Sequence, residues 1–237
     1  MHIENTFLVY KDKDVFLYDI LTGEIVGEYG YNQFATGGIN IISGNNIFHF
    51  ILREIVKYDF KSGKKIYHKD FPFPIGILGF FANEDKVFFS GYDCYLPYCK
   101  VICLDTLNDE ILWEVGYGIY KCTILEKGIL IVLKANFGCT DTSFYEISGI
   151  DAKIGRTIWS KPFNIDEYKI NVHNDQIIID TYYGYTINRF YMNIETGEFE
   201  GIYSYSVDKI FSKYVFNDNK FYGLQGDTLY CYKLWDK

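Results

Sequence analysis

The side chains with the chemistry of metal ligands or nucleophiles are few and scattered in this sequence. His49 alternates with apolar neighbours, as a packed core histidine does, while His68 and His173 stand in polar surroundings and are expected in solvent. The close pair Cys94 and Cys99 has no second pair at the spacing that zinc sites use, although these two could form a disulfide in an exported protein. The sequence therefore predicts no metal ligand. The cysteines expected as small core residues of strands are Cys103, Cys122 and Cys231.

Motifs that would carry catalysis are missing from the sequence. It contains no Gly-rich phosphate loop, no His-Glu-x-x-His and no Gly-x-Ser-x-Gly. Paired carboxylates could act as general acid and base on a glycan. Most aspartates, however, stand at turn positions, where the geometry of the turn already explains them. We therefore predict no catalytic residue and no cofactor.

The elements that would position any site are set by a repeated phrase. An acidic or amide residue is followed four residues later by a turn residue, most often glycine, and then by an aromatic or aliphatic strand. The phrase begins at Asp19, Asp59, Asp105, Asp151 and Asn193, with steps of 40, 46, 46 and 42 residues. A period near 40 with strands in every unit is typical of a propeller or a repeat array.

Each full repeat resolves into four antiparallel strands. In the second repeat these are expected over residues 34–42, 47–52, 54–60 and 64–69, and the phrase forms the turn between the third and fourth. Residues 6–30 supply three strands, and residues 209–235 supply three more, which gives 22 strands and an expected total of six blades. No segment has a sustained 3.6-residue period, so almost no helix is expected.

The predicted fold is therefore an all-β class: a single β-propeller of four-stranded antiparallel blades over residues 1–237, with incomplete first and last blades. The closure of the ring leaves two alternatives open. Residues 1–5 could add a short strand to the first blade, or the ring could have five blades and an irregular end.

Eight residues after the phrase begins stand Tyr67, Trp113 and Trp159. The pattern aromatic/aliphatic-x-Asp-x-x-Thr-Gly-x-x-x-Trp resembles the tryptophan-docking motif of the PQQ-like (quinoprotein dehydrogenase-like) β-propeller repeat. The resemblance spans almost the whole chain but is degenerate: Gly27 and Gly201 replace the aromatic, and Asp109 replaces a glycine. It implies that the tryptophans pack between neighbouring blades. It does not carry over the quinoprotein activity, because the chain is too short for eight blades and has no Asp-x-Asp-x-Asp-Gly calcium loop.

Charge and the chain's start bear on partner and compartment. The net charge of −8 disfavours nucleic acid and permits attraction to a basic partner. No basic segment followed by an apolar run precedes the first strand, and no apolar run is long enough to span a bilayer. We therefore expect a cytoplasmic protein that does not enter a membrane.

The candidate binding face is predicted from the loops between second and third strands. These loops hold the extra residues of the long repeats and are rich in aromatics, and insertions in repeat proteins often map to the binding face. Tyrosine suits such a face because it offers a large contact area with a polar tip. The predicted partner-binding residues are Tyr92, Asp93, Tyr95, Tyr98, Phe137, Asp141, Tyr182, Tyr183 and Tyr185.

The function that these features favour is a non-enzymatic interaction protein that binds a protein or peptide partner, with a basic partner favoured by charge. Inhibition of a toxin by an immunity protein is one concrete form. A glycan-binding module is a first alternative, since tyrosines also stack on sugars. A sugar- or peptide-directed lyase or hydrolase is a second, and it requires two carboxylates, or a histidine and a carboxylate, to converge in the central funnel.

Overall fold

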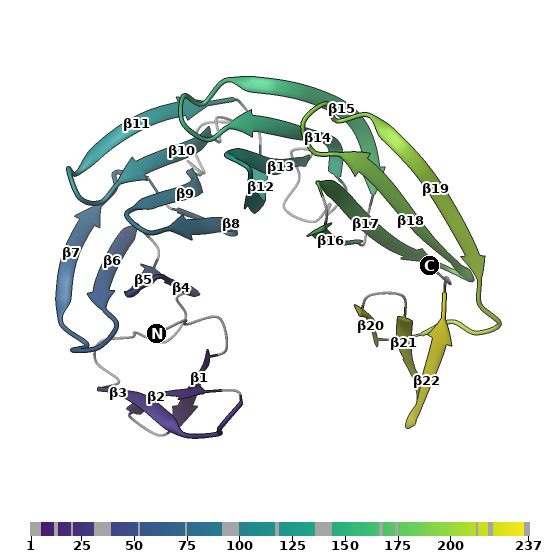
Figure 1. Ribbon diagram of the computed structural model, residues 1–237, viewed down its shortest axis with the longest axis horizontal. Coiled ribbons are helices and arrows are strands. Elements are labelled where there is room, and N and C mark those ends of the chain that lie inside the picture. The colour runs from purple at the N-terminus through teal and green to yellow at the C-terminus, as the bar shows by residue number, and fades with distance from the viewer. Residues whose placement is uncertain are drawn as a thin grey trace. The chain divides into compact units, whose positions relative to one another are not determined.

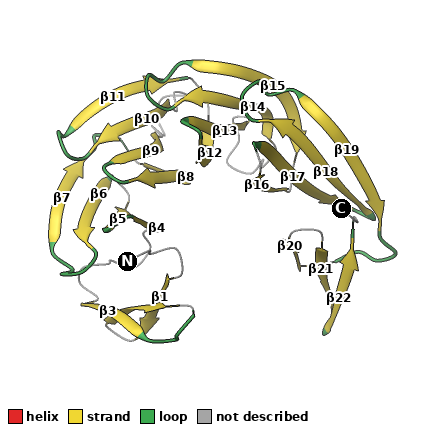
Figure 2. Ribbon diagram, in the orientation of Figure 1, coloured by secondary structure: helices red, strands yellow, loops and turns green. Residues whose placement is uncertain are grey.

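In the computed structural model the described part of the chain consists of strands joined by loops (Figures 1 and 2). It divides into two compact units. The first unit comprises residues 1–123 with 152–156, and the second comprises 124–151 with 157–237. The prediction of a single domain over 1–237 stays a prediction. The described residues are 6–11, 14–19, 21–30, 39–51, 53–73, 75–91, 100–116, 119–135, 144–165, 168–173, 175–211, 213–217 and 220–234.

The described residues form 22 strands and contain no helix. They make six antiparallel sheets in which consecutive strands are neighbours, four sheets of four strands and two of three. The first three sheets are β1 (Thr6–Lys11), β2 (Asp14–Asp19), β3 (Ile25–Gly30); β4 (Ile39–Ser43), β5 (Asn46–Ile51), β6 (Glu54–Asp59), β7 (Lys65–Asp70); and β8 (Ile75–Asn83), β9 (Lys86–Gly91), β10 (Lys100–Asp105), β11 (Glu110–Val115).

The remaining sheets follow the same order. They are β12 (Ile119–Glu126), β13 (Ile129–Ala135), β14 (Phe144–Asp151), β15 (Thr157–Ile165); β16 (Tyr168–His173), β17 (Gln176–Tyr183), β18 (Thr186–Asn193), β19 (Phe199–Ser206); and β20 (Lys213–Asn217), β21 (Lys220–Gln225), β22 (Thr228–Lys233). The predicted all-β class and the four-stranded antiparallel sheets are confirmed.

The repeated phrase forms the turn between the third and fourth strands of each four-stranded sheet, and between β2 and β3 in the first sheet. The side chain of Asp19 accepts hydrogen bonds from the backbone N–H groups two and three residues later, at 2.8 and 2.9 Å, and Asn193 does the same at 2.9 and 3.1 Å. The turn then closes with a positive φ at its fifth residue, which glycine adopts without a Cβ penalty. The phrase is therefore a local device that reverses the chain.

Both tryptophans dock onto the turn of the next repeat, as the resemblance implied. The indole of Trp113 donates from Nε1 to the carbonyl oxygen of Ala152 at 3.0 Å, and that of Trp159 donates to the carbonyl of Ile194 at 2.8 Å. The rings cover the glycines of these turns so closely that an added Cβ would lie 2.6 Å from Trp113 at Gly155 and 2.5 Å from Trp159 at Gly197. Each tryptophan thus requires a glycine in the following repeat.

The second repeat has a different pair at the same two positions. Tyr67 takes the place of the tryptophan, and the facing turn carries Asp109 with a φ of 59° instead of glycine. The Tyr67 hydroxyl donates to Oδ1 of Asp109 at 2.7 Å, and Lys69 reaches the same oxygen at 2.6 Å. These two hydrogen bonds lower the pKa of Asp109, the bond from Lys69 being the larger cause. Tyrosine and aspartate therefore replace ring-on-glycine packing with a polar contact.

Lysines bind the turns between first and second strands within each unit. Lys57, buried on β6, pairs with Asp85 in the β8–β9 turn and also donates to the hydroxyl of Thr106. In the second unit Lys127, in the β12–β13 turn, reaches Asp175 at 2.7 Å and Glu195 at 3.4 Å. The first ion pair joins a strand to the turn of the next sheet, and the second joins two short turns.

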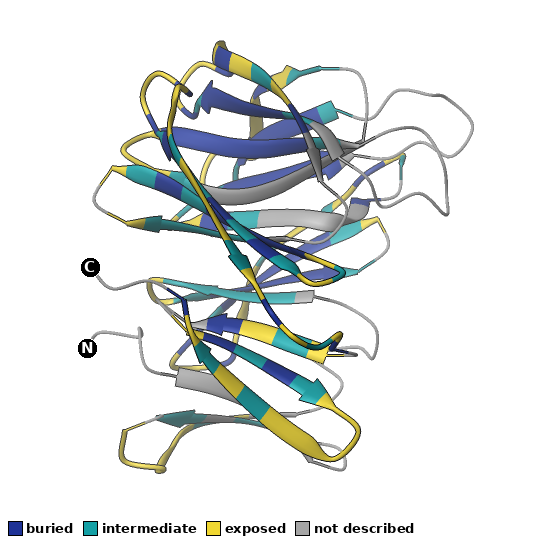
Figure 3. Cartoon of the chain, turned by 90° about the vertical axis from the view of Figure 1, so that its right-hand side faces the viewer, coloured by how far each residue is buried: buried dark blue, intermediate teal, exposed yellow. Residues whose placement is uncertain are grey.

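Burial follows the position of a strand in its sheet (Figure 3). The third strands β6 and β10 have four consecutive buried residues each, whereas the fourth strands β7 and β11 are mostly exposed. Central strands are buried on both faces because neighbouring sheets pack against them. One such core, between the β4–β7 and β8–β11 sheets, includes Phe48, Phe71 and Phe89.

Two sequence predictions about single core residues have opposite outcomes. His49 is buried, as predicted, and its Nδ1 lies 2.7 Å from Oδ1 of Asn40. Cys103 is buried as well, but the prediction for Cys231 is wrong, because this cysteine is exposed on β22. The reason is that β22 is the outer strand of its sheet among the described residues, and its side chains are exposed or half-buried along its whole length. The side chain of Cys122 lies outside the described residues.

A glycine-to-alanine pair tests the docking contact. Gly197→Ala is expected to cost about 1–2 kcal/mol for the left-handed backbone and a further 1–3 kcal/mol for the clash with Trp159. Gly128, with a φ of 74° and nothing within 4 Å of an added Cβ, is the matched control that carries only the backbone cost. Urea denaturation measures both, and equal losses for the two variants would show that the indole does not depend on the glycine.

The pH dependence of a turn aspartate gives a second test. Hydrogen bonds from the Ser62 hydroxyl and backbone N–H lower the pKa of Asp59, so its stabilising effect is present above the unfolded pKa of about 3.9 and is lost as pH falls through the folded value. Asp59→Asn should keep the turn, as Asn193 does, and weaken the loss of stability below about pH 4. Thermal denaturation from pH 7 to pH 2.5 measures this. Asp59→Ala, which removes the acceptor, should be less stable at pH 7.

Candidate functional site: the aromatic turn between β17 and β18

Three of the nine predicted partner-binding residues lie in the described part of the chain. Tyr92, Asp93, Tyr95, Tyr98, Phe137 and Asp141 lie outside the described residues. Tyr182, Tyr183 and Tyr185 are at the end of β17 and in the turn that leads to β18. They divide into one buried residue and two exposed ones: Tyr182 is 7% exposed, Tyr183 81% and Tyr185 55%.

The turn that carries these tyrosines is as tight as an antiparallel hairpin allows. Tyr183 pairs with Thr186, so Gly184 and Tyr185 are the only two residues of the loop. Gly184 has a φ of 60°, and the positive value at the first loop residue alone is what a type II′ turn requires. The carbonyl of Tyr185 accepts the backbone N–H of Val207 at 2.8 Å, which fixes the turn from outside the hairpin.

Tyr182 supports the turn from below instead of facing a partner. Its hydroxyl accepts the backbone N–H of Phe211 at 2.9 Å and donates to the carbonyl of Lys209 at 3.3 Å. Its ring lies edge-on to Tyr214 at 5.0 Å and 5.3 Å from Phe221. Tyr182 therefore holds the turn in position, because its ring and its hydroxyl both contact other parts of the protein.

The segment that Tyr182 holds, residues 207–211, is itself anchored in a second core. Phe211 lies 5.4 Å from Phe221 and packs onto Gly223 of β21, where an added Cβ would lie 2.3 Å from the ring. The same cluster contains Ile187 and Val207. The connection between β19 and β20 thus has a fixed position beside the aromatic turn.

A buried ion pair fixes the hairpin that presents the turn. Asp180 on β17 and Arg189 on β18 are direct cross-strand partners, and the guanidinium binds both carboxylate oxygens at 2.6 and 2.9 Å. Burial raises the pKa of Asp180, and the hydrogen bonds and charge of Arg189 oppose that rise. A two-point contact of this kind is directional, so it sets register as well as pairing.

The exposed surface of the site consists of Tyr183, Tyr185 and Ile210, which we call the aromatic turn surface. Ile210, 53% exposed, lies between Lys209 and Phe211, the two residues that bind the Tyr182 hydroxyl. Two rings on a rigid turn, together with an aliphatic side chain of the neighbouring β19–β20 connection, can contact an apolar or sugar surface, and the phenol groups can hydrogen-bond at its edge.

An acidic group lies next to this surface. The Tyr232 hydroxyl donates to Oδ1 of Asp208 at 2.5 Å, which lowers the pKa of Asp208 and raises the pKa of Tyr232 to about 12. The carboxylate is exposed and ionised at neutral pH. A ligand that binds at this turn would therefore be favoured if it carries a positive charge.

Sequence reasoning missed Ile210 and the supporting residues of 207–211. These residues follow a fourth strand, where no turn motif or insertion marks them. Val207 lies three residues before Ile210, and Phe211 lies one residue after it. All three residues are hydrophobic, so the sequence did not indicate which of their side chains would face solvent. Only the contact of Phe211 with Tyr182 decides it.

No known protein family matches this sequence, and no curated protein matches it. Solved structures do match its fold. They include BamB from Moraxella catarrhalis (TM-score 0.53, 13% identity), the β-propeller domain of Cps50 (Swd1) from Myceliophteria thermophila (0.59, 11%) and Hsv2 from Kluyveromyces lactis (0.65, 11%). These proteins are β-propellers.

The matches extend along nearly all of this chain but along only part of each of the other proteins. They cover 96%, 97% and 98% of this chain, and 66% of BamB, 79% of the Cps50 domain and 72% of Hsv2. At these identities the likeness concerns the fold. Within the described residues there is also no helix of the length and apolar character needed to cross a membrane.

Removing one hydroxyl tests the support of the turn. Tyr182→Phe leaves the buried N–H of Phe211 without its acceptor, which is expected to cost about 1–3 kcal/mol. Tyr183→Phe removes the hydroxyl of the neighbouring exposed ring and is expected to stay within about 0.5 kcal/mol of the parent. Urea denaturation gives both values. Indistinguishable variants would mean that the Tyr182 hydroxyl does not hold residues 207–211.

Proposed function

We propose that this chain is a non-enzymatic binding protein whose aromatic turn surface contacts a protein or peptide partner. The observation that carries the proposal is the contrast between Tyr182 and Tyr183. One ring is buried and fixes the turn, while the next is 81% exposed on a rigid loop of two residues. Rings held in this way lose little conformational entropy on binding, which favours their use in interfaces.

The exposed tyrosines have no evident role in folding. Neither Tyr183 nor Tyr185 belongs to the buried cluster of β17–β22, in which Tyr182 takes part. Large exposed aromatic side chains that are grouped, rather than scattered singly, are typical of interaction sites. The ionised Asp208 nearby and the net charge of −8 favour a basic partner. Inhibition or immunity against a basic toxin is the concrete form of this proposal.

The wider setting of the site is part of the same proposal. The sheets close into a single propeller of six blades over residues 1–237, the repeat is of the PQQ-like type, and the protein works in the cytoplasm. The support is the repeated docking of Trp113 and Trp159 and the likeness to propellers, which commonly mediate protein interactions. The predicted contacts that lie outside the described residues, Tyr92, Asp93, Tyr95, Tyr98, Phe137 and Asp141, stay predictions.

Site-specific photo-crosslinking tests this function. A benzophenone amino acid in place of Tyr183 should yield a discrete protein adduct in native cells, and Tyr185→Ala in the same chain should reduce that adduct severalfold. Tyr185→Ala removes one of the two exposed rings without touching the supporting contacts of Tyr182. Mass spectrometry of the adduct identifies the partner.

The matched control places the same benzophenone at Leu229, an exposed residue on β22 that is outside the aromatic turn surface. An adduct of equal yield from position 229, or one insensitive to Tyr185→Ala, would rule out this surface as the binding site. Saturable binding to an oligosaccharide panel that depends on Tyr183 and Tyr185, without a protein adduct, would replace the protein partner with a glycan.

A further inference from the structure

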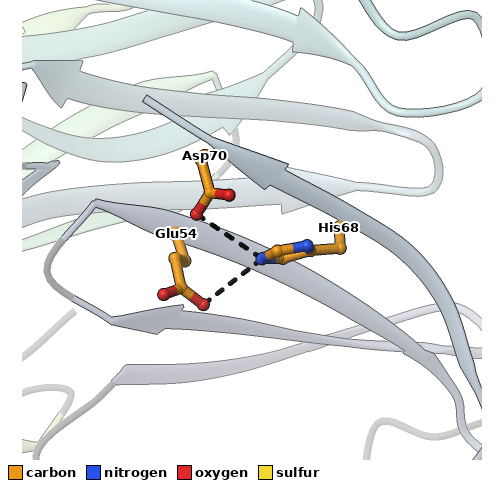
Figure 4. A group of neighbouring side chains, drawn as sticks. All are labelled: Glu54, His68 and Asp70. Atoms are coloured by element: carbon orange, nitrogen blue, oxygen red, sulfur yellow. Dashed lines mark hydrogen bonds and ion pairs between the residues drawn. The ribbon is translucent and has the colours of Figure 1, made fainter. Parts of the chain in front are cut away.

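Three metal-binding side chains meet on one face of the β6–β7 hairpin (Figure 4). Glu54, the first residue of β6, is the direct cross-strand partner of Asp70, the last residue of β7. His68 is two residues before Asp70 on the same strand, so strand periodicity puts it on the same face. Their ligand atoms all lie within 4.8 Å of one another, and all three side chains are at least partly open to solvent.

The end of the hairpin that carries these residues is held in place by its surroundings. The backbone N–H of Phe71 donates to the carbonyl of Arg53 at 2.8 Å, which closes the pair just beyond Glu54 and Asp70. The ring of Phe71 is buried in the core with Phe89, at 5.1 Å. The backbone positions of the three side chains are therefore fixed before any ligand arrives.

The distances around the imidazole are long for charge-assisted hydrogen bonds and close to the spacing of ligand atoms around a metal. Nε2 of His68 is hydrogen-bonded to Oε2 of Glu54 at 3.3 Å and lies 3.6 Å from Oδ1 of Asp70. Charge-assisted N–H···O bonds are shorter, about 2.7–2.9 Å. In a tetrahedral zinc site with bonds of about 2.0–2.1 Å, adjacent ligand atoms are roughly 3.3–3.4 Å apart.

The charges of the group also call for a cation. Two carboxylates directly opposite each other destabilise a strand pair. Among the described residues the ion-pair partner of both Glu54 and Asp70 is His68, which carries a positive charge only when it is protonated. Other exposed carboxylates, such as Asp109 and Glu114, have a lysine within 2.6 Å. A divalent ion bound between the two carboxylates would remove their repulsion.

We propose that Glu54, His68 and Asp70 form a zinc site. One imidazole nitrogen and two carboxylate oxygens are ligands that Zn²⁺ accepts, while the nitrogen disfavours Ca²⁺ and Mg²⁺, which prefer oxygen. The fourth position faces solvent and takes a water molecule or a side chain from outside. The sequence showed no such site, because 14 residues separate Glu54 from His68 and only the strand register unites them.

Calorimetric titration of the full chain with zinc chloride tests the site. We expect one zinc per chain, and a loss of affinity of at least about tenfold in His68→Ala, with a similar loss in Glu54→Gln, which keeps the shape of the side chain. His173→Ala is the matched control, since His173 is an exposed histidine on β16 that is not among the three ligands, and the variant should bind zinc as the parent does.

Nuclear magnetic resonance of the histidine rings distinguishes zinc binding at His68 from a loss of affinity that a substitution causes by disturbing the fold. In the parent chain the ring signals of His68 should shift on adding zinc, and those of His173 should not. The proposal is overturned if the heat is not saturable at one equivalent, or if His68→Ala keeps the parent affinity. Calcium binding that Glu54→Gln abolishes and His68→Ala leaves intact would also overturn it, since that would be an all-oxygen site.

Discussion

The packing of an indole ring on a bare backbone turn is the interaction on which the rest of this structure depends. Trp113 and Trp159 each cover a glycine of the following repeat and bind the carbonyl of the residue that begins its turn. The contact needs two things at once, a positive φ and the absence of a Cβ. It therefore ties the local conformation of one turn to the packing of the preceding sheet, so that secondary structure and sheet–sheet association are specified together.

This constraint separates the two ends of each sheet. The end with the phrase turns is bound by rings, by Lys57 and Lys127, and by backbone hydrogen bonds to neighbouring turns. The opposite end, where β17 turns into β18, has no such phrase, and its order comes from Tyr182 and Phe211 instead. The exposed aromatic residues Tyr183 and Tyr185 lie at this second end, away from the phrase turns.

The fold could be predicted from the sequence because the hydrogen bonds that form its turns are local. Asp19 and Asn193 bind backbone groups two and three residues away, and a glycine or Asp109 follows at a fixed offset, so spacing alone reveals the turns and the strands between them. The site was only half readable. Tyr182 and Tyr183 are adjacent, identical in type and equally suited to an interface. Which of them is buried depends on Phe211, which is 29 residues from Tyr182.

The sequence by itself determined the class of fold and the order of the strands, since both follow from a regular period and from contacts within a turn. The family resemblance implied that the tryptophans pack between neighbouring repeats, and the glycine that each one covers is seen only in the structure. The tertiary structure alone decided which aromatics face solvent, that Cys231 is exposed, and that Glu54, His68 and Asp70 share one face. The physical reason is that the exposure of a side chain and the convergence of ligands depend on strand register and on the packing of one sheet against another. Neither can be read from the spacing of residues along the chain.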